Sequence, residues 1–134
     1  FNKYYGRNGW KATTVRSLSV GQGEVETTPL QLANLASIIA NRGYYYPPHL
    51  MMRTGGDLNI TSKYEDKRGV KIDSKHFSTL IEGMDMVYNG EMGSARWYAI
   101  SDSTIVACGK TGTSQNPHGK NHSIFISHCV LSYS

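Results

Sequence analysis

The sequence has no run of 18 or more apolar residues, so no segment of it predicts a membrane-spanning helix. Its first residues also lack the apolar stretch of a signal peptide, although an anchor can lie upstream in a longer parent protein. No block of lysine and arginine is longer than two residues, which argues against a nucleic-acid partner. Two cysteines, Cys108 and Cys129, are too few to indicate a redox compartment.

The composition is that of one folded domain or of a piece of one. The chain has 134 residues, of which 39% are hydrophobic and 18% are charged, and its formal net charge is +4. A chain of this length can bury roughly two-thirds of the surface that its unfolded form exposes. No cofactor and no resident metal is expected from the residues present.

Two amphipathic helices are predicted, over residues 29–41 and 74–88. For the first, Thr28 is a good N-cap residue, Pro29 fits the first helical position, and Gly43 can follow the end in a left-handed conformation. Each helix has an apolar stripe at helical spacing. The stripes are Leu32, Leu35, Ala36 and Ile39 in the first helix, and Phe77, Leu80, Ile81, Met84, Val87 and Tyr88 in the second.

An antiparallel hairpin is predicted from residues 103–115 and 122–130, which flank an Asn-Pro-His-Gly turn. A turn centred between His118 and Gly119 places Cys108 opposite Cys129. A cross-strand disulfide then needs Cα atoms within about 7 Å of one another. A slip of one residue removes this pairing, so two unpaired thiols are the alternative.

The remaining segments are predicted to be irregular. Residues 1–26 are expected to form a loop with one short extended piece at 15–20, and residues 53–69 a surface loop or weak hairpin. Tyr44-Tyr45-Tyr46 runs into two prolines and is expected to be an extended, packed connector. The predicted fold is α+β, with the two helices packed on the hairpin of an incomplete sheet.

The stretch Lys110-Thr111-Gly112-Thr113 has the residue types of an anion-binding strand. A lysine ammonium attracts a carboxylate, and neighbouring hydroxyls can donate hydrogen bonds to it. A glycine lets a ligand approach the backbone, and a backbone N–H can stabilise an oxyanion. All four functions support acyl transfer, but none of these residues is a nucleophile.

Three segments, in this order, resemble class B penicillin-binding proteins, the monofunctional peptidoglycan transpeptidases, and among them the elongation type. Residues 21–43 resemble one segment of that family, and Gly93-Ser94-Ala95-Arg96 resembles the Gly-Thr-Ala element that precedes its motif strand. Residues 109–126 resemble the Lys-Thr-Gly motif strand, its turn and the next strand. The resemblance covers roughly Ser17 to Ser127 and implies part of the β-lactamase/transpeptidase-like fold.

The resemblance implies a role for each residue that matches the motif. Lys110 would bind the carboxylate of a peptidoglycan stem peptide or a β-lactam, and Thr111 and Thr113 would offer hydroxyls to it. The backbone N–H of Thr113 would be one of two oxyanion-hole donors, and Gly112 would allow close approach. The family also implies a periplasmic or cell-envelope location, with the parent protein anchored in the inner membrane upstream.

The match to the family is incomplete. No serine of the chain has a lysine three positions later, so the Ser-x-x-Lys segment that carries the nucleophile is absent. Ser114-Gln115-Asn116 fits the letters of the family's Ser-x-Asn segment, but it follows the motif strand instead of preceding it, and we interpret it as a strand exit. Residues 128–134 do not resemble the family. We therefore expect residues 1–134 to be the C-terminal part of a transpeptidase domain, inactive alone, with the catalytic helix before Phe1.

Several alternatives compete with this interpretation. A phosphate-binding P-loop would need glycine at position 104, which is Thr104. His118 and His122 are four residues apart near the two cysteines, which suggests zinc, but they flank a turn instead of sharing a helix face. A non-catalytic scaffold or interaction remnant of the fold is the main functional alternative.

Uncovered apolar surface and a strand edge also favour self-association of the chain.

Overall fold

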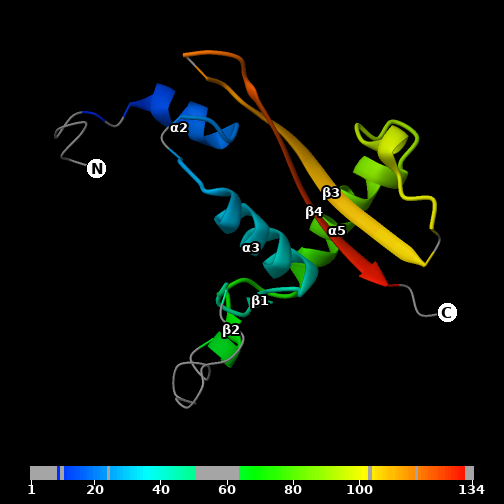
Figure 1. Cartoon of the computed structure of the whole chain (residues 1–134). Coiled ribbons are helices and arrows are strands. Elements are labelled where there is room, and N and C mark those ends of the chain that lie inside the picture. The colour runs from blue at the N-terminus through cyan, green and yellow to red at the C-terminus, as the bar shows by residue number, and fades with distance from the viewer. Residues whose placement is uncertain are drawn as a thin grey trace.

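A computed structural model describes residues 9, 11–23, 25–50, 64–102, 104–116 and 118–131. Figure 1 shows two helices beside a long two-stranded hairpin, with a smaller strand pair at the far end of the first of these helices. Most of the predicted loop 53–69, residues 53–63, lies outside the described residues. The elements in chain order are α2 (Ala12–Ser19), α3 (Pro29–Ala40), β1 (Tyr44–Tyr45), β2 (Arg68–Gly69), α5 (Lys75–Asn89), the 3-10 helix η1 (Arg96–Tyr98), β3 (Ile105–Ser114) and β4 (His122–Leu131).

The strands β3 and β4 pair antiparallel along ten residues each, from Ile105 opposite Leu131 to Ser114 opposite His122. The predicted hairpin and the α+β fold are therefore confirmed. The connection 115–121 is centred on His118, because paired residue numbers sum to 236 in this register.

Of the two alternatives for the cysteines, two unpaired thiols are found. Cys108 lies opposite His128, and Cys129 lies opposite Ala107. The register differs by one residue from the predicted one, since the turn is centred on His118 itself. Side chains alternate between the faces of a strand, so the two cysteines belong to opposite faces of the hairpin. Both are free thiols, Cys108 buried and Cys129 exposed.

Helix α3 begins as the sequence predicts. The backbone N–H of Gln31 donates to Thr28 Oγ1 at 3.3 Å, and the Gln31 side chain accepts from the Thr28 N–H at 2.8 Å. This reciprocal capping box satisfies backbone donors that the first turn leaves without a partner. The helix ends at Ala40, one residue before the predicted end.

Helix α5 runs from Lys75 to Asn89, within one residue of the predicted bounds. Its first turn is held by Asp73, whose Oδ1 accepts from the backbone N–H of Lys75 at 3.1 Å. Ser74 is the N-cap residue but makes no side-chain capping bond. The side chain that accepts a hydrogen bond from the first turn therefore belongs to the residue before the N-cap.

The small core lies where the two helices meet the hairpin. Helix α5 packs on β3, α3 packs on β4, and the two helices contact one another. Ile39 from α3, Met84 from α5 and Cys108 from β3 form one buried cluster, against which Ile81 packs. Residues from three elements thus share a single core, as the two apolar stripes predict.

A second, smaller sheet forms beside α3. Tyr44 pairs with Gly69 and Tyr45 with Arg68, antiparallel. The Lys67 ammonium lies 3.7 Å from the centre of the Tyr44 ring, a cation–π contact. The tyrosine segment is therefore extended, as predicted. Its strand partner is β2, at the end of the 53–69 segment.

The prediction of an extended piece at residues 15–20 is wrong, because Ala12–Ser19 is the helix α2. None of its residues is buried, and Val15 is exposed. Ala12, Val15 and Leu18 recur three residues apart, but the eight residues of this helix are fewer than the window over which such a pattern identifies a helix. Gly21 and Gly23, both at positive φ, follow its end.

In the part of the chain that the structure describes, no helix is long and apolar enough to span a membrane.

The sharp turn after α3 depends on Gly43, which has a φ of +107°. A Cβ atom at this position would lie 3.0 Å from Cε2 of Phe77, which is only 2% exposed. Both the backbone conformation and the packing therefore favour glycine.

We predict that Gly43→Ala lowers the free energy of unfolding by about 1–3 kcal/mol, measured by urea denaturation. Gly83→Ala is the matched control, because it lies inside α5 and a Cβ there would meet no atom within 4 Å. That change should raise stability by about 0.5–1 kcal/mol. Equal effects of the two substitutions would contradict this account of Gly43.

Candidate functional site

The Lys-Thr-Gly segment (residues 110–113) forms the second half of β3. Thr111 pairs with Phe125 and Thr113 with Ser123, so alternation places both hydroxyls on one face of the hairpin. Lys110 and Gly112 occupy the other face. The segment is exposed except for the half-buried Thr111. The structure thus brings two hydroxyls together along an accessible strand.

The Lys110 ammonium is exposed, and its Nζ donates to the backbone carbonyl of Thr111 at 2.7 Å. An ammonium has three donors, so two remain for a ligand. Among the described residues no carboxylate lies within salt-bridge distance of Lys110; the recorded ion pair joins Lys75 and Asp73. Within the described residues, the Lys110 ammonium is therefore exposed and has no ion-pair partner.

A cavity of about 460 Å³ lies on the hydroxyl face of the segment. The T-shaped ring pair of Tyr88 and Phe125, with centroids 5.5 Å apart, forms part of its wall. Tyr98 of η1, an exposed residue, also lines it. No sequence motif marked Tyr98, because its place beside the segment follows from the packing of η1 on α5.

The Thr111 hydroxyl in this cavity has a protein partner. Oγ of Ser94 lies 3.2 Å from Oγ1 of Thr111, and either atom can be the donor. Ser94 belongs to the 93–96 segment that the family resemblance singled out without a role. The structure therefore joins two of the three resembling segments through one side-chain contact.

A second cavity, of about 420 Å³, is lined by all four residues of the segment. Lys110 and Gly112 line it together with Ile126, and Val25 and Leu32 close it from the segment before α3 and from α3 itself. All four residues of the segment therefore border this one cavity, and the two threonines also border the cavity of about 460 Å³.

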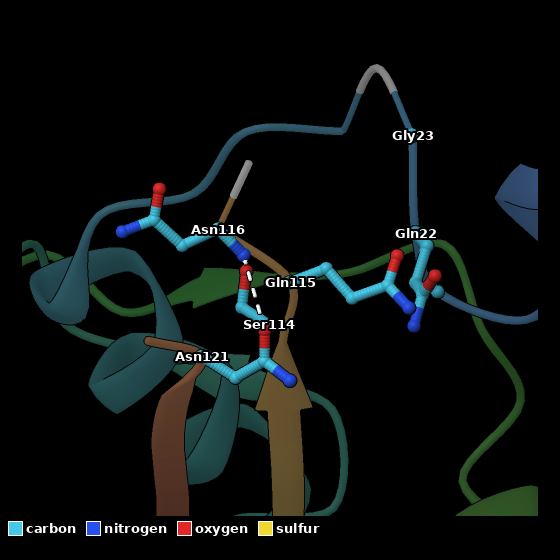
Figure 2. A pocket seen from close by; sticks show the side chains of 7 residues that line it. Gln22, Gly23, Ser114, Gln115, Asn116 and Asn121 are labelled. Carbon is cyan, nitrogen blue, oxygen red and sulfur yellow. Dashed lines mark hydrogen bonds between the residues drawn. The ribbon is translucent and has the colours of Figure 1, made fainter. Parts of the chain in front are cut away.

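A third cavity, of about 560 Å³, lies beyond the end of β3 (Figure 2). Figure 2 shows Gln22 and Gln115 directed toward one another across it. Beside them the backbone N–H of Asn116 donates to Asn121 Oδ1 at 3.4 Å. Ser114 is the last residue of β3, so Ser114-Gln115-Asn116 is the strand exit that the sequence indicated.

The Cys108 thiol is not an activated nucleophile. Burial raises its pKa, and the charges of Asp85 and Cys129 raise it further. Its cross-strand neighbour His128 is half-buried, and burial lowers the pKa of that imidazole. Within the described residues the buried Nδ1 of His128 has no hydrogen-bond partner. A buried thiol with a raised pKa is inert.

The histidines of the connection do not form a metal centre with their neighbours in the described residues. No group of three or more His, Cys, Asp or Glu side chains there is placed to hold a metal ion. His122 begins β4 opposite Ser114, and its Nε2 lies 3.4 Å from Asn116 Nδ2. It contacts the strand exit and not His118.

Residues 3–128 match the family model of the penicillin-binding protein transpeptidase domain. The chain belongs to this transpeptidase family. The family that the three motif segments predicted is therefore confirmed.

Relatives and a solved structure agree with this membership. Peptidoglycan D,D-transpeptidase MrdA of Haemophilus influenzae is 32% identical over 112 residues, which are 79% of this chain and 16% of that protein. The MrdA protein of Acinetobacter baumannii is 28% identical over 109 residues, 81% of this chain and 16% of the relative. A crystal structure of Pseudomonas aeruginosa PBP2 in complex with WCK 5153 has a TM-score of 0.72 and 27% identity, and covers 94% of this chain and 28% of that one. The transpeptidase chain thus spans about a sixth of the length of these MrdA relatives.

Two glycines of β3 serve different purposes. A Cβ on Gly109 would lie 2.6 Å from Phe125 Cζ and 2.8 Å from the Ile126 carbonyl oxygen. A Cβ on Gly112 would meet nothing closer than 3.9 Å. Gly109 is therefore needed for packing, whereas Gly112 borders open space.

We predict that Gly109→Ala lowers the free energy of unfolding by about 1–3 kcal/mol through overpacking. Gly112→Ala, two residues along the same strand, should change it by less than about 0.5 kcal/mol. Urea denaturation of the two variants measures both values. A larger loss for Gly112→Ala than for Gly109→Ala would show that this assignment is wrong.

Proposed function

We propose that residues 1–134 are the C-terminal part of a peptidoglycan D,D-transpeptidase domain and supply its carboxylate-binding strand. The parent protein would cross-link the cell wall by acyl transfer. The observation that supports this most directly is the arrangement of Lys110, Thr111 and Thr113, which present one exposed ammonium and two hydroxyls on an accessible strand. The family membership and the 16% share of the MrdA relatives support it as well.

Each residue of the segment has a distinct part in the proposed reaction. The Lys110 ammonium neutralises the substrate carboxylate, and the Thr111 and Thr113 hydroxyls donate hydrogen bonds to it. The open space beside Gly112 lets the acyl group approach the backbone. The Thr113 N–H then stabilises the oxyanion that forms when a serine attacks the carbonyl carbon. That serine comes from outside this chain.

The proposed ligands share one chemical feature, a carboxylate next to a reactive carbonyl. A peptidoglycan stem peptide and a β-lactam both have it, and either would be bound by the complete protein. PBP2 of Pseudomonas aeruginosa is described in complex with WCK 5153. A cell-envelope location, with an anchor elsewhere in the parent protein, follows from the same proposal.

A non-catalytic scaffold is the second candidate function. The sequence has no Ser-x-x-Lys segment, so the chain on its own has no group to hold an acyl intermediate. Cys108, the buried thiol, does not replace it. The two candidates differ in one respect: only the first requires the Lys-Thr-Gly segment to bind a carboxylate.

We predict that a β-lactam such as benzylpenicillin forms no covalent adduct with the 134-residue chain, as measured by intact-mass spectrometry. In a complete domain that contains this segment, Lys110→Ala should slow acylation about tenfold to a hundredfold. The reason is the loss of a charge-assisted contact of roughly 1.5–3 kcal/mol. Lys120→Ala, which removes an exposed lysine of the connection 115–121, is the matched control. A stoichiometric adduct on the 134-residue chain would contradict the proposal.

We also propose that the chain self-associates through its exposed sheet or helix faces. Val106 and Val130 pair across β3 and β4, on one face of the sheet, and are 40% and 53% exposed. Sedimentation equilibrium should show a dimer or larger species, and Val130→Lys should weaken it by placing a charge on that surface. Val20→Lys, at a 71% exposed position after α2, should have no effect. A monomer at high protein concentration would refute self-association.

A further inference from the structure

The 93–96 segment is fixed against the end of helix α5 by backbone hydrogen bonds. The Gly93 N–H donates to the Gly90 carbonyl at 2.9 Å, and the Ala95 N–H donates to the Val87 carbonyl at 3.0 Å. The Arg96 guanidinium also donates to the Glu91 carbonyl. Hydrogen bonds on both sides of Ser94 therefore hold the segment against the end of the helix.

Packing restricts the segment further. A Cβ on Gly93 would lie 2.5 Å from the Val87 carbonyl oxygen and 2.6 Å from that of Met86, so no side chain fits there. Ala95 is only 5% exposed. Between these two residues, Ser94 is exposed and directs its hydroxyl to Thr111. The segment therefore holds one hydroxyl at a fixed place beside β3.

The direction of this hydrogen bond matters for ligand binding. Each hydroxyl has one proton to donate, and a carboxylate only accepts. If Thr111 donated to Ser94, it would have no proton left for a carboxylate. If Ser94 donates to Thr111 Oγ1, the Thr111 proton is directed into the cavity of about 460 Å³. Donation along such a chain also strengthens each bond in it.

We propose that Ser94 is a positioning residue that orients and polarises the Thr111 hydroxyl for a ligand carboxylate. This role rests on the proposed carboxylate-binding function of the Lys-Thr-Gly segment. It also explains why the Gly-Ser-Ala-Arg element precedes the motif strand. Gly93 and Ala95 fit the segment to α5, and Ser94 makes the contact with the strand.

The first measurement needs no ligand. Three-bond couplings to the Thr111 γ-methyl group report its χ1 rotamer in the 134-residue chain. The unsubstituted chain and Ser94→Thr should show one rotamer, because both retain a hydroxyl at position 94. Ser94→Ala should show rotamer averaging. Ser101→Ala, which removes an exposed serine after η1, is the matched control and should behave as the unsubstituted chain.

The second measurement uses N-acetyl-D-alanine and its carboxamide as probes in an NMR titration of the same four chains. The ratio of their affinities reports recognition of the carboxylate. Ser94→Ala should reduce this ratio about threefold to tenfold, the usual effect of one hydrogen bond. Ser94→Thr should preserve it. A purely structural role of Ser94 would lower the urea midpoint and leave the ratio unchanged.

The outcomes separate the two proposals. A single Thr111 rotamer and an unchanged ratio in Ser94→Ala would overturn the positioning role. No preference for the carboxylate in the unsubstituted chain would overturn the proposed function, and the couplings would then decide the orientation of Thr111 independently. Rotamer averaging of Thr111 together with a reduced affinity ratio in Ser94→Ala would support both proposals.

Discussion

The pairing of β3 with β4 is the constraint on which the rest of the structure depends. Its register places Thr111 and Thr113 on one face and Lys110 on the other, and brings Cys108 into the core with Ile39 and Met84. A shift of one residue would exchange the two faces along one of the strands. The core and the candidate site therefore rely on the same ladder of hydrogen bonds.

Each of the two longer helices packs on one strand of this pair. Helix α5 packs on β3 and provides, through the segment after it, the Ser94 hydroxyl that meets Thr111. Helix α3 packs on β4 and closes the cavity on the lysine side. The three segments that resemble the transpeptidase family are thus distant in sequence but adjacent around one strand.

Local signals in the sequence predicted most of the described fold. The capping pattern around Thr28 and the apolar stripe of α5 are properties of neighbouring residues, so both helices were placed within about one residue. The hairpin was predicted, but its register was not, because the centre of the turn depends on how residues 115–121 close. Helix α2 was missed because its eight residues are too few for apolar periodicity to identify a helix. The contact of Ser94 with Thr111 joins residues 17 positions apart and depends on tertiary packing.

The central claim is that the hydroxyl face of the Lys-Thr-Gly segment binds a carboxylate ligand. Isotope-filtered NOEs between N-acetyl-D-alanine and the methyl-labelled 134-residue chain test it most directly. The account predicts NOEs from the ligand methyl group to the γ-methyl groups of Thr111 and Thr113. NOEs that reach only the side chains of Gln22 and Gln115, around the larger cavity beyond β3, would contradict it.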